Sequence, residues 1–212
     1  MAKFRLHTFR IVFGLAAVTL LASACAMTSP PMRFYLLSTI EDAAPTVAAP
    51  GEALVVVGPM QLPGYLDRRE LVVRQPDGRF SLREFDRWGE PLDELLTNTV
   101  TANLVRLTGS HRVAAFPLPG RASADLRIVG RVLRFDADAS GLAMLEVQWS
   151  ILDASGEPRM PVRIDAYRAQ ASGTDTAALV AALSDVLAQF SRQLAGELLL
   201  AAGAGAAPDD AP

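Results

Sequence analysis

Cysteine, histidine and lysine are nearly absent from this 212-residue sequence, which has one cysteine (Cys25), two histidines (His7 and His111) and one lysine (Lys3). A single thiol excludes a disulfide within the chain. No pair of histidines stands at metal-binding spacing, and neither Gly-x-Ser-x-Gly nor a glycine-rich phosphate-binding loop is present. The sequence therefore lacks the usual motifs of a hydrolase, a nucleotide-binding enzyme or a metalloprotein. We predict that the protein needs no cofactor and is not an enzyme.

Acidic residues are missing from the first forty positions, while three basic residues precede an uninterrupted apolar run at 11–22 (Lys3, Arg5 and Arg10). A basic start, an apolar core of roughly 7–15 residues and small residues before a cut are typical of a secretory signal peptide. We therefore predict that residues 1–24 are a signal peptide and that cleavage occurs between Ala24 and Cys25.

The position of Cys25 directly after small residues is typical of bacterial lipoproteins, in which that thiol is alkylated with a diacylglyceryl group before cleavage. We predict that Cys25 is lipidated, which would fix the mature protein to a bilayer surface, since two or more acyl chains anchor stably. The alternatives are plain secretory cleavage and a retained anchor, although residues 11–24 are short of the roughly 20 that a spanning helix needs. Ala26 stands where aspartate would signal retention at the inner membrane, so we predict the outer membrane, with the domain facing the periplasm.

Lysine is also missing from everything after residue 24, where 17 arginines face 23 acidic residues and give a net charge of −6. This charge has the wrong sign for a nucleic-acid binder. The remaining 188 residues suit one domain. We predict a proline-containing tether at 25–31, a single domain at 32–200 and a disordered tail at 201–212 that is rich in alanine, glycine, proline and aspartate.

Hydrophobic patterning predicts an α+β fold with a mainly antiparallel sheet and two helices packed on one of its faces. Helices are indicated by apolar residues at three- and four-residue spacing, between Pro91 and Gly109 and from Thr174 to about residue 200. The pattern predicts a hairpin at 71–85 and an antiparallel meander formed by the last three strands. The predicted strands are 33–38, 53–60, 71–74, 80–85, 112–116, 124–137, 142–153 and 160–170.

The densest mixture of aromatic and charged side chains predicts a candidate partner interface, since arginine and large aromatic residues are enriched where proteins bind partners. It comprises Tyr65, Leu66, Asp67, Arg68, Arg87 and Trp88. The alternative is a solvated hairpin end, in which Asp67, Arg68 and Glu70 pair among themselves and Trp88 packs at the start of the first helix.

Two further candidates are weaker. His111 follows a predicted helix end and is interpreted as an exposed side chain rather than a catalytic base. Residues 136–141 imitate the start of a calcium loop, but Val147 stands where its bidentate glutamate belongs, so we interpret them as a polar hairpin turn.

Several of these segments, in this order, resemble the ABC-type transport auxiliary lipoprotein family, the PqiC-like proteins, over nearly all of the mature chain. The resemblance rests on the Cys25 region and on residues 34–37 (Phe-Tyr-Leu-Leu), 57–59 (Val-Gly-Pro), 62–68 (Leu-Pro-Gly-Tyr-Leu-Asp-Arg), 71–74 (Leu-Val-Val-Arg), 88–92 (Trp-Gly-Glu-Pro-Leu) and 133–136 (Leu-Arg-Phe-Asp). It implies an outer-membrane lipoprotein that works with MCE-domain or ABC-transporter proteins in lipid transport.

The resemblance further implies a docking or capping role. A ring-shaped homo-oligomer would suit a cap, but no residue pattern in the sequence gives the number of subunits. A lipoprotein that itself holds a lipid in an apolar pocket is the alternative function. A periplasmic hydrolase is a third, for which the sequence offers no nucleophile and base pair.

Overall fold

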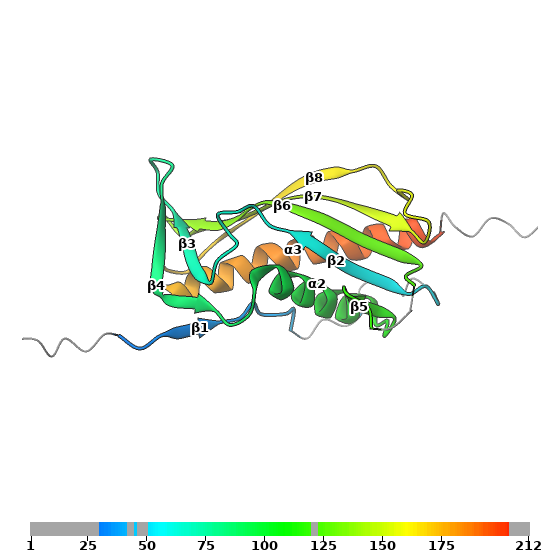
Figure 1. The fold of residues 1–212 in the computed structure, drawn as a ribbon, viewed down its shortest axis with the longest axis horizontal. Helices are drawn as coiled ribbons and strands as arrows, with labels where there is room; N and C mark the ends of the chain where they lie inside the picture. Colours follow the sequence, from blue (N-terminus) through cyan, green and yellow to red (C-terminus); the bar gives the residue numbers. More distant parts are fainter. Residues whose placement is uncertain (1–29, 42–44, 46–50, 120–122, 204–212) are drawn as a thin grey trace, which may run out of the picture. The chain divides into compact units, whose positions relative to one another are not determined.

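The computed structural model describes residues 30–41, 45, 51–119 and 123–203. The predicted signal peptide, Cys25 and residues 204–212 lie outside this part of the chain. The elements within it are, in order, β1 (Arg33–Tyr35), β2 (Val55–Gln61), β3 (Glu70–Arg74), β4 (Phe80–Trp88), α2 (Leu92–Thr108), β5 (Val113–Ala115), β6 (Leu126–Asp138), β7 (Leu142–Asp153), β8 (Arg163–Gln170) and α3 (Thr176–Gly203) (Figure 1).

The α+β class is confirmed, but the prediction of a mainly antiparallel sheet is wrong, because the sheet is mixed. The β3–β4 hairpin and the β6–β7–β8 meander are antiparallel, as the turn residues between them predicted. The other four pairings of the described strands, β1–β4, β2–β5, β2–β6 and β3–β6, are parallel. A short turn fixes the direction of the next strand, whereas a helix such as α2 can return the chain in either direction.

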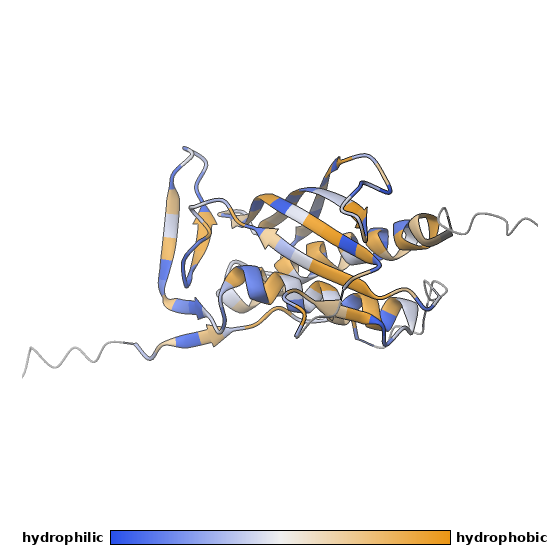
Figure 2. Ribbon diagram, turned by 45° about the vertical axis from the view of Figure 1, so that its right-hand side comes forward, coloured by the Kyte–Doolittle hydropathy of each residue, from blue (hydrophilic) through white to orange (hydrophobic). Residues whose placement is uncertain are grey.

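Both helices pack on one face of the sheet. α2 contacts β2 and β5, α3 contacts β6, β7 and β8, and the two helices contact each other (Figure 1). All the apolar positions that predicted the helices are buried, and Gly109 ends α2 in the left-handed conformation with φ 66°. Hydrophobic residues follow β2 and the helices, while the tip of the β3–β4 hairpin is hydrophilic (Figure 2).

Aromatic rings fill the contact between α3 and the meander. Trp149 of β7 meets Phe190 of α3 edge-on, with ring centroids 5.8 Å apart. A cavity of only about 10 Å³ lies between the sheet and the two helices. Its lining residues are Met60, Leu96, Val100, Val132, Leu145, Val147, Leu187 and Phe190. A tightly packed core of this kind has no internal room for an acyl chain at this place.

The segment after β1 is held in the core by side chains of both helices. The buried amide of Ile40 donates to Asn103 Oδ1 at 2.8 Å, and Asn103 Nδ2 donates to Ser191 Oγ at 3.1 Å. The amide of Ser38 donates to Ser184 Oγ at 3.0 Å. Because these bonds satisfy backbone groups that leave water, they fix the point at which the amino-terminal segment enters the domain.

The end of α3 differs slightly from the prediction. At its start, Asp175 caps the helix by accepting a hydrogen bond from the amide of Ala178 at 3.0 Å. The helix continues to Gly203, three residues into the predicted tail, because Ala201 still packs in the core with 5% exposure. Within the described ranges no helix is long and apolar enough to cross a membrane.

Candidate partner-binding surface

The six residues predicted as a partner interface separate into three groups. Leu66 and Trp88 are core residues, 3% and 4% exposed. Because side chains alternate along β4, Trp88 faces the core beside Phe135, with ring centroids 6.5 Å apart. This packing matches the alternative given for Trp88, and neither residue can serve as a surface contact.

Arg87 and Tyr65 are half-buried and have partners within the domain. Arg87 Nη2 lies 3.4 Å from Glu70 Oε1, so Glu70 pairs with Arg87 and not with Arg68 as the solvated alternative supposed. Tyr65 stacks on Phe80 of the hairpin with ring centroids 4.6 Å apart. The Arg87–Glu70 pair therefore links the two strands of the hairpin, and Tyr65 ties the segment before β3 to the hairpin.

Asp67 and Arg68 are exposed, together with Arg69, and we call these three residues the 67–69 turn. The amide of Trp88 donates to the Arg69 carbonyl at 2.8 Å, which fixes the turn against the end of β4. A hollow of about 180 Å³ lies beside it, lined by Leu62, Leu66, Asp67, Arg68, Arg69, Pro91, Leu92 and Asp93. The 67–69 turn is therefore the part of the predicted interface that a partner can reach.

A buried carboxylate, Asp136, lies where β6 changes its neighbour. β6 pairs with β2 as far as Arg131 and with β3 from Ala137 onwards. The Asp136 side chain, which is 0% exposed, lies between these two pairings. A carboxylate buried at such a place needs hydrogen-bond partners from nearby side chains.

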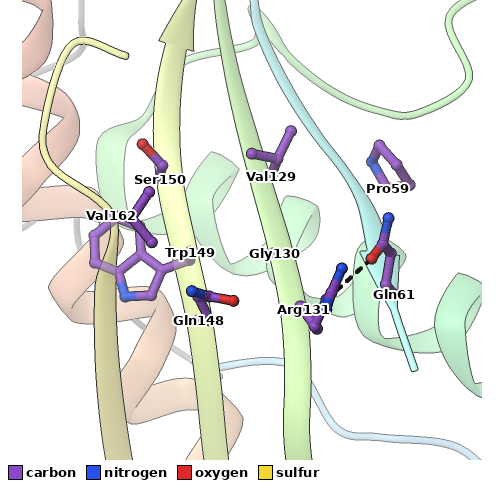
Figure 3. A pocket seen from close by; sticks show the side chains of 9 residues that line it. All are labelled: Pro59, Gln61, Val129, Gly130, Arg131, Gln148, Trp149, Ser150 and Val162. Atoms are coloured by element: carbon purple, nitrogen blue, oxygen red, sulfur yellow. Dashed lines mark hydrogen bonds between the residues drawn. The ribbon is translucent and has the colours of Figure 1, made fainter. Parts of the chain in front are cut away.

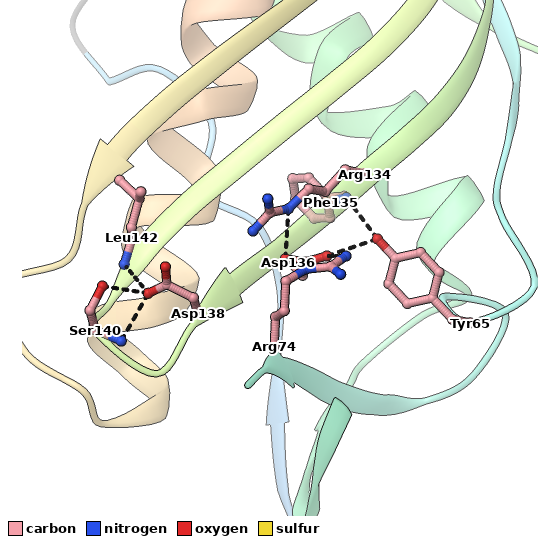
Figure 4. A network of polar contacts seen from close by, with 8 residues as sticks. All are labelled: Tyr65, Arg74, Arg134, Phe135, Asp136, Asp138, Ser140 and Leu142. Carbon is pink, nitrogen blue, oxygen red and sulfur yellow. Dashed lines mark hydrogen bonds and ion pairs between the residues drawn. The ribbon is translucent and has the colours of Figure 1, made fainter. Parts of the chain in front are cut away.

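Three side chains donate to this carboxylate (Figure 4). Arg74 of β3 donates from Nε at 3.1 Å and from Nη2 at 2.8 Å, and Arg134 of β6 donates from Nε at 2.9 Å. The Tyr65 hydroxyl donates at 2.8 Å. Bidentate pairing with arginine is the strongest of the common charge-assisted geometries, so Asp136 joins β3 and the segment before it to β6.

Tyr65 and Arg74 remain fixed in their protonation states by this arrangement. Burial raises the pKa of Tyr65 to about 12, and the Asp136 carboxylate adds to the effect. The hydrogen bond to Asp136 raises the pKa of Arg74. At neutral pH the phenol is therefore protonated and donates its hydrogen bond to the Asp136 carboxylate.

A second carboxylate, Asp86, ties β1 and the start of α3 to β4. Asp86 is 2% exposed and accepts from Arg33 Nε at 2.6 Å and Nη2 at 3.0 Å, and from the Thr176 hydroxyl at 2.5 Å. Burial alone raises the pKa of Asp86, but the bonds from Arg33 and Thr176 outweigh it and hold the pKa below 3.8. The carboxylate is therefore ionised in the folded protein well into the acid range.

We expect Asp86 to make stability depend on pH. Because its folded pKa is depressed, its contribution is present above the unfolded value of about 3.9 and is lost as pH falls through the folded pKa. Asp86→Asn should therefore lower Tm at pH 7, and the difference from wild type should shrink below about pH 4 in thermal unfolding followed by circular dichroism. Asp77→Asn, at the exposed hairpin tip, is the control. A Tm difference for Asp86→Asn that stays constant with pH would contradict this assignment.

The two turns of the meander share one sequence, Asp-Ala-Ser-Gly, at 138–141 and 153–156. In each, the aspartate Oδ1 accepts from the amide and hydroxyl of the serine two residues on and from one further amide (Figure 4 shows the first). This confirms the polar turn at 136–141, since Asp138 Oδ1 is occupied by protein donors. Within the described ranges no group of three metal-ligating side chains occurs.

His111 is exposed next to the end of α2, as predicted. The face of the sheet opposite the helices carries an open hollow of about 340 Å³ beside β2, whose pairing with β6 shifts register between Val57 and Met60 (Figure 3). It is lined by Pro59, Gln61, Val129, Gly130, Arg131, Gln148, Trp149, Ser150 and Val162, and Arg131 Nε donates to Gln61 Oε1 at 3.3 Å. The lining mixes apolar groups with neutral amides and one arginine, which suits contact with another surface better than acid–base chemistry.

Comparison with known proteins decides the family. Residues 35–195 match the family described as the ABC-type transport auxiliary lipoprotein component. The chain belongs to this family. The auxiliary lipoprotein is similar to the intermembrane transport lipoprotein PqiC of Escherichia coli (strain K12), with 25% identity over 176 residues. The aligned region covers 83% of this chain and 91% of PqiC. The PqiC protein of Shigella flexneri matches to the same extent.

Solved structures confirm the fold of the auxiliary lipoprotein. Protein XCC0632 of Xanthomonas campestris is 22% identical and superposes with a TM-score of 0.64, covering 81% of this chain and 97% of its own. An uncharacterised protein of known structure is 20% identical with the same TM-score, covering 80% and 99%. The structures show the shared fold, and the family match assigns the protein to the auxiliary lipoprotein components of ABC-type transport.

Proposed function

We propose that this protein is a non-catalytic docking subunit of an intermembrane lipid transport system, held at the outer membrane by acylated Cys25. The observation that carries the proposal is the match to the intermembrane transport lipoprotein PqiC over 91% of that protein. Support also comes from Cys25, which directly follows a signal-peptide pattern, and from Ala26 as the next residue. The partner is an MCE-domain or ABC-transporter protein that reaches across the periplasm.

The anchor and the 67–69 turn are connected through β4. β1 pairs with β4 from Arg33 to Tyr35, and the turn is bonded to Trp88 at the end of the same strand. The seven steps from Cys25 to Met32 span at most about 25 Å. A partner that binds the 67–69 turn is therefore recruited close to the membrane surface, which is what a docking subunit requires.

Recovery of the partner from an envelope extract tests the proposal. A soluble chain that begins at Ala26 should retain an MCE-domain or ABC-transporter protein, identified by mass spectrometry. Arg68→Glu reverses an exposed charge in the turn and should reduce the recovery several-fold. Arg192→Glu makes the same change on the exposed side of α3 and should leave it unchanged. Absence of any such transport protein from the wild-type eluate would overturn the proposed function.

The alternative, a lipoprotein that encloses a lipid, is less well supported. The cavity between the sheet and the helices is about 10 Å³, which is about what a single water needs. The 340 Å³ hollow on the opposite face is open. Acyl chains that copurify with the soluble domain and survive gel filtration would favour this alternative over docking.

A further inference from the structure

Three apolar side chains lie exposed on one face of β1 and the residues beside it. Met32, Phe34 and Leu36 are 38%, 62% and 57% exposed. They alternate with Arg33, which pairs with Asp86, and with Tyr35, which packs against the core. This two-residue period places them on the same side of the strand, and we call them the β1 stripe.

The β1 stripe borders β4 and the residues that follow it. Phe34 pairs in register with Arg87 of β4, whose Nη2 lies 3.4 Å from Glu70 Oε1. Leu36 lies over Gly89, since a Cβ added to that glycine would come within 3.0 Å of Leu36 Cδ2. A row of three exposed apolar side chains is suited to an apolar or interfacial environment.

We infer that the β1 stripe rests on the lipid bilayer to which Cys25 is attached. This inference relies on the proposed anchoring. Seven steps of chain separate Cys25 from Met32, so the stripe cannot lie more than about 25 Å from the anchor. Pro30 and Pro31 stand directly before the stripe and restrict the last part of this connection.

Tethering makes even weak membrane contact effective. An anchored chain converts the second contact into an intramolecular one, with an effective concentration in the millimolar range for short linkers. Phenylalanine and leucine are typical of surfaces that lie in the headgroup region. Because Ile40 and Ser38 are bonded to the two helices, contact at β1 sets the orientation of the whole described domain against the membrane.

The domain offers a matched apolar control on another strand. Val162 and Ile164, beside and in β8, are 58% and 59% exposed, as much as Phe34 and Leu36. β8 pairs only with β7 among the described strands, and β1 only with β4, so the two apolar sites lie on different edges of the sheet (Figure 1). Non-specific hydrophobic adsorption would bring both apolar sites into contact with the membrane, whereas an anchored orientation would bring only the β1 stripe into contact with it.

Environment-sensitive fluorescence distinguishes these cases. Cys25 is the only cysteine, so a chain in which a hexahistidine tag replaces residues 1–25 accepts a single new thiol for an NBD label. The labelled sites are Leu36→Cys and Val162→Cys. The tagged proteins bind vesicles of phosphatidylethanolamine and phosphatidylglycerol that contain a nickel-chelating lipid, with and without a doxyl-labelled quenching lipid.

The expected result is a shift of emission to shorter wavelength and strong quenching by doxyl lipid at position 36, with neither change at position 162. Equal responses at the two positions, or none at position 36, would overturn the inference. A spectral change at position 36 that depends on protein concentration without vesicles would also overturn it, because a second copy would then cover the stripe. The nickel lipid replaces the acyl group, so a negative result leaves Cys25 acylation and partner binding untouched.

Discussion

Asp136→Ala is expected to lower the free energy of unfolding by about 3 kcal/mol, the lower end of the range for removing one partner of a buried ion pair. The carboxylate is fully buried and accepts from Arg74, Arg134 and Tyr65. The arginines are 29% and 22% exposed and can turn partly towards water, which limits the loss. Urea unfolding followed by circular dichroism measures the effect.

Two companion variants show whether the loss arises from this cluster. Tyr65→Phe removes one hydrogen bond and keeps the stacking on Phe80, so about 1 kcal/mol is expected. Asp77→Ala removes a carboxylate from the exposed pair with Arg79 and should cost less than about 1 kcal/mol. If Asp136→Ala were as mild as Asp77→Ala, Asp136 would not join β3 to β6.

Cys25→Ser is expected to abolish acylation and to leave residues 1–24 attached, because alkylation of the thiol precedes cleavage in lipoprotein processing. In its own host, the variant should incorporate no radiolabelled palmitate and should migrate as the heavier precursor. The wild-type chain should incorporate the palmitate and migrate as the lighter, processed protein.

Ala26→Asp is the matched control for the anchor. It keeps the thiol and the cleavage site, so labelling and processing should match wild type. Aspartate at this position signals retention, so sucrose-gradient fractionation should find the protein with the inner membrane instead of the outer membrane. Incorporation of radiolabelled palmitate by the Cys25→Ser variant would contradict the assignment of Cys25 as the acylated residue.

Local patterns predicted the helices and hairpins well because those elements depend on neighbours in sequence. The apolar positions of α2 and α3 are buried as their spacing indicated, and turn residues gave the three antiparallel pairings. The parallel pairings of β2 with β5 and β6 join residues about sixty to seventy positions apart. No local signal gives the direction of strands that meet over such distances, so the mixed sheet was missed.

The candidate surface was predicted in part. Asp67 and Arg68 of the predicted interface are exposed, but composition could not show that Trp88 and Leu66 face the core. The Asp136 cluster was missed because its members come from three separate segments. One signal was present, since Arg134 and Asp136 interrupt the hydrophobic alternation of β6 where the strand changes neighbours.

The central claim is that the folded domain acts from a fixed place on a membrane, through a lipid on one cysteine and a surface that binds a transport partner. Mass spectrometry of the amino-terminal peptide from the native host tests it most directly. The expected peptide begins at Cys25 and carries a diacylglyceryl group on the thiol. A peptide that begins elsewhere, or an unmodified Cys25 in protein recovered from the aqueous phase, would contradict the account.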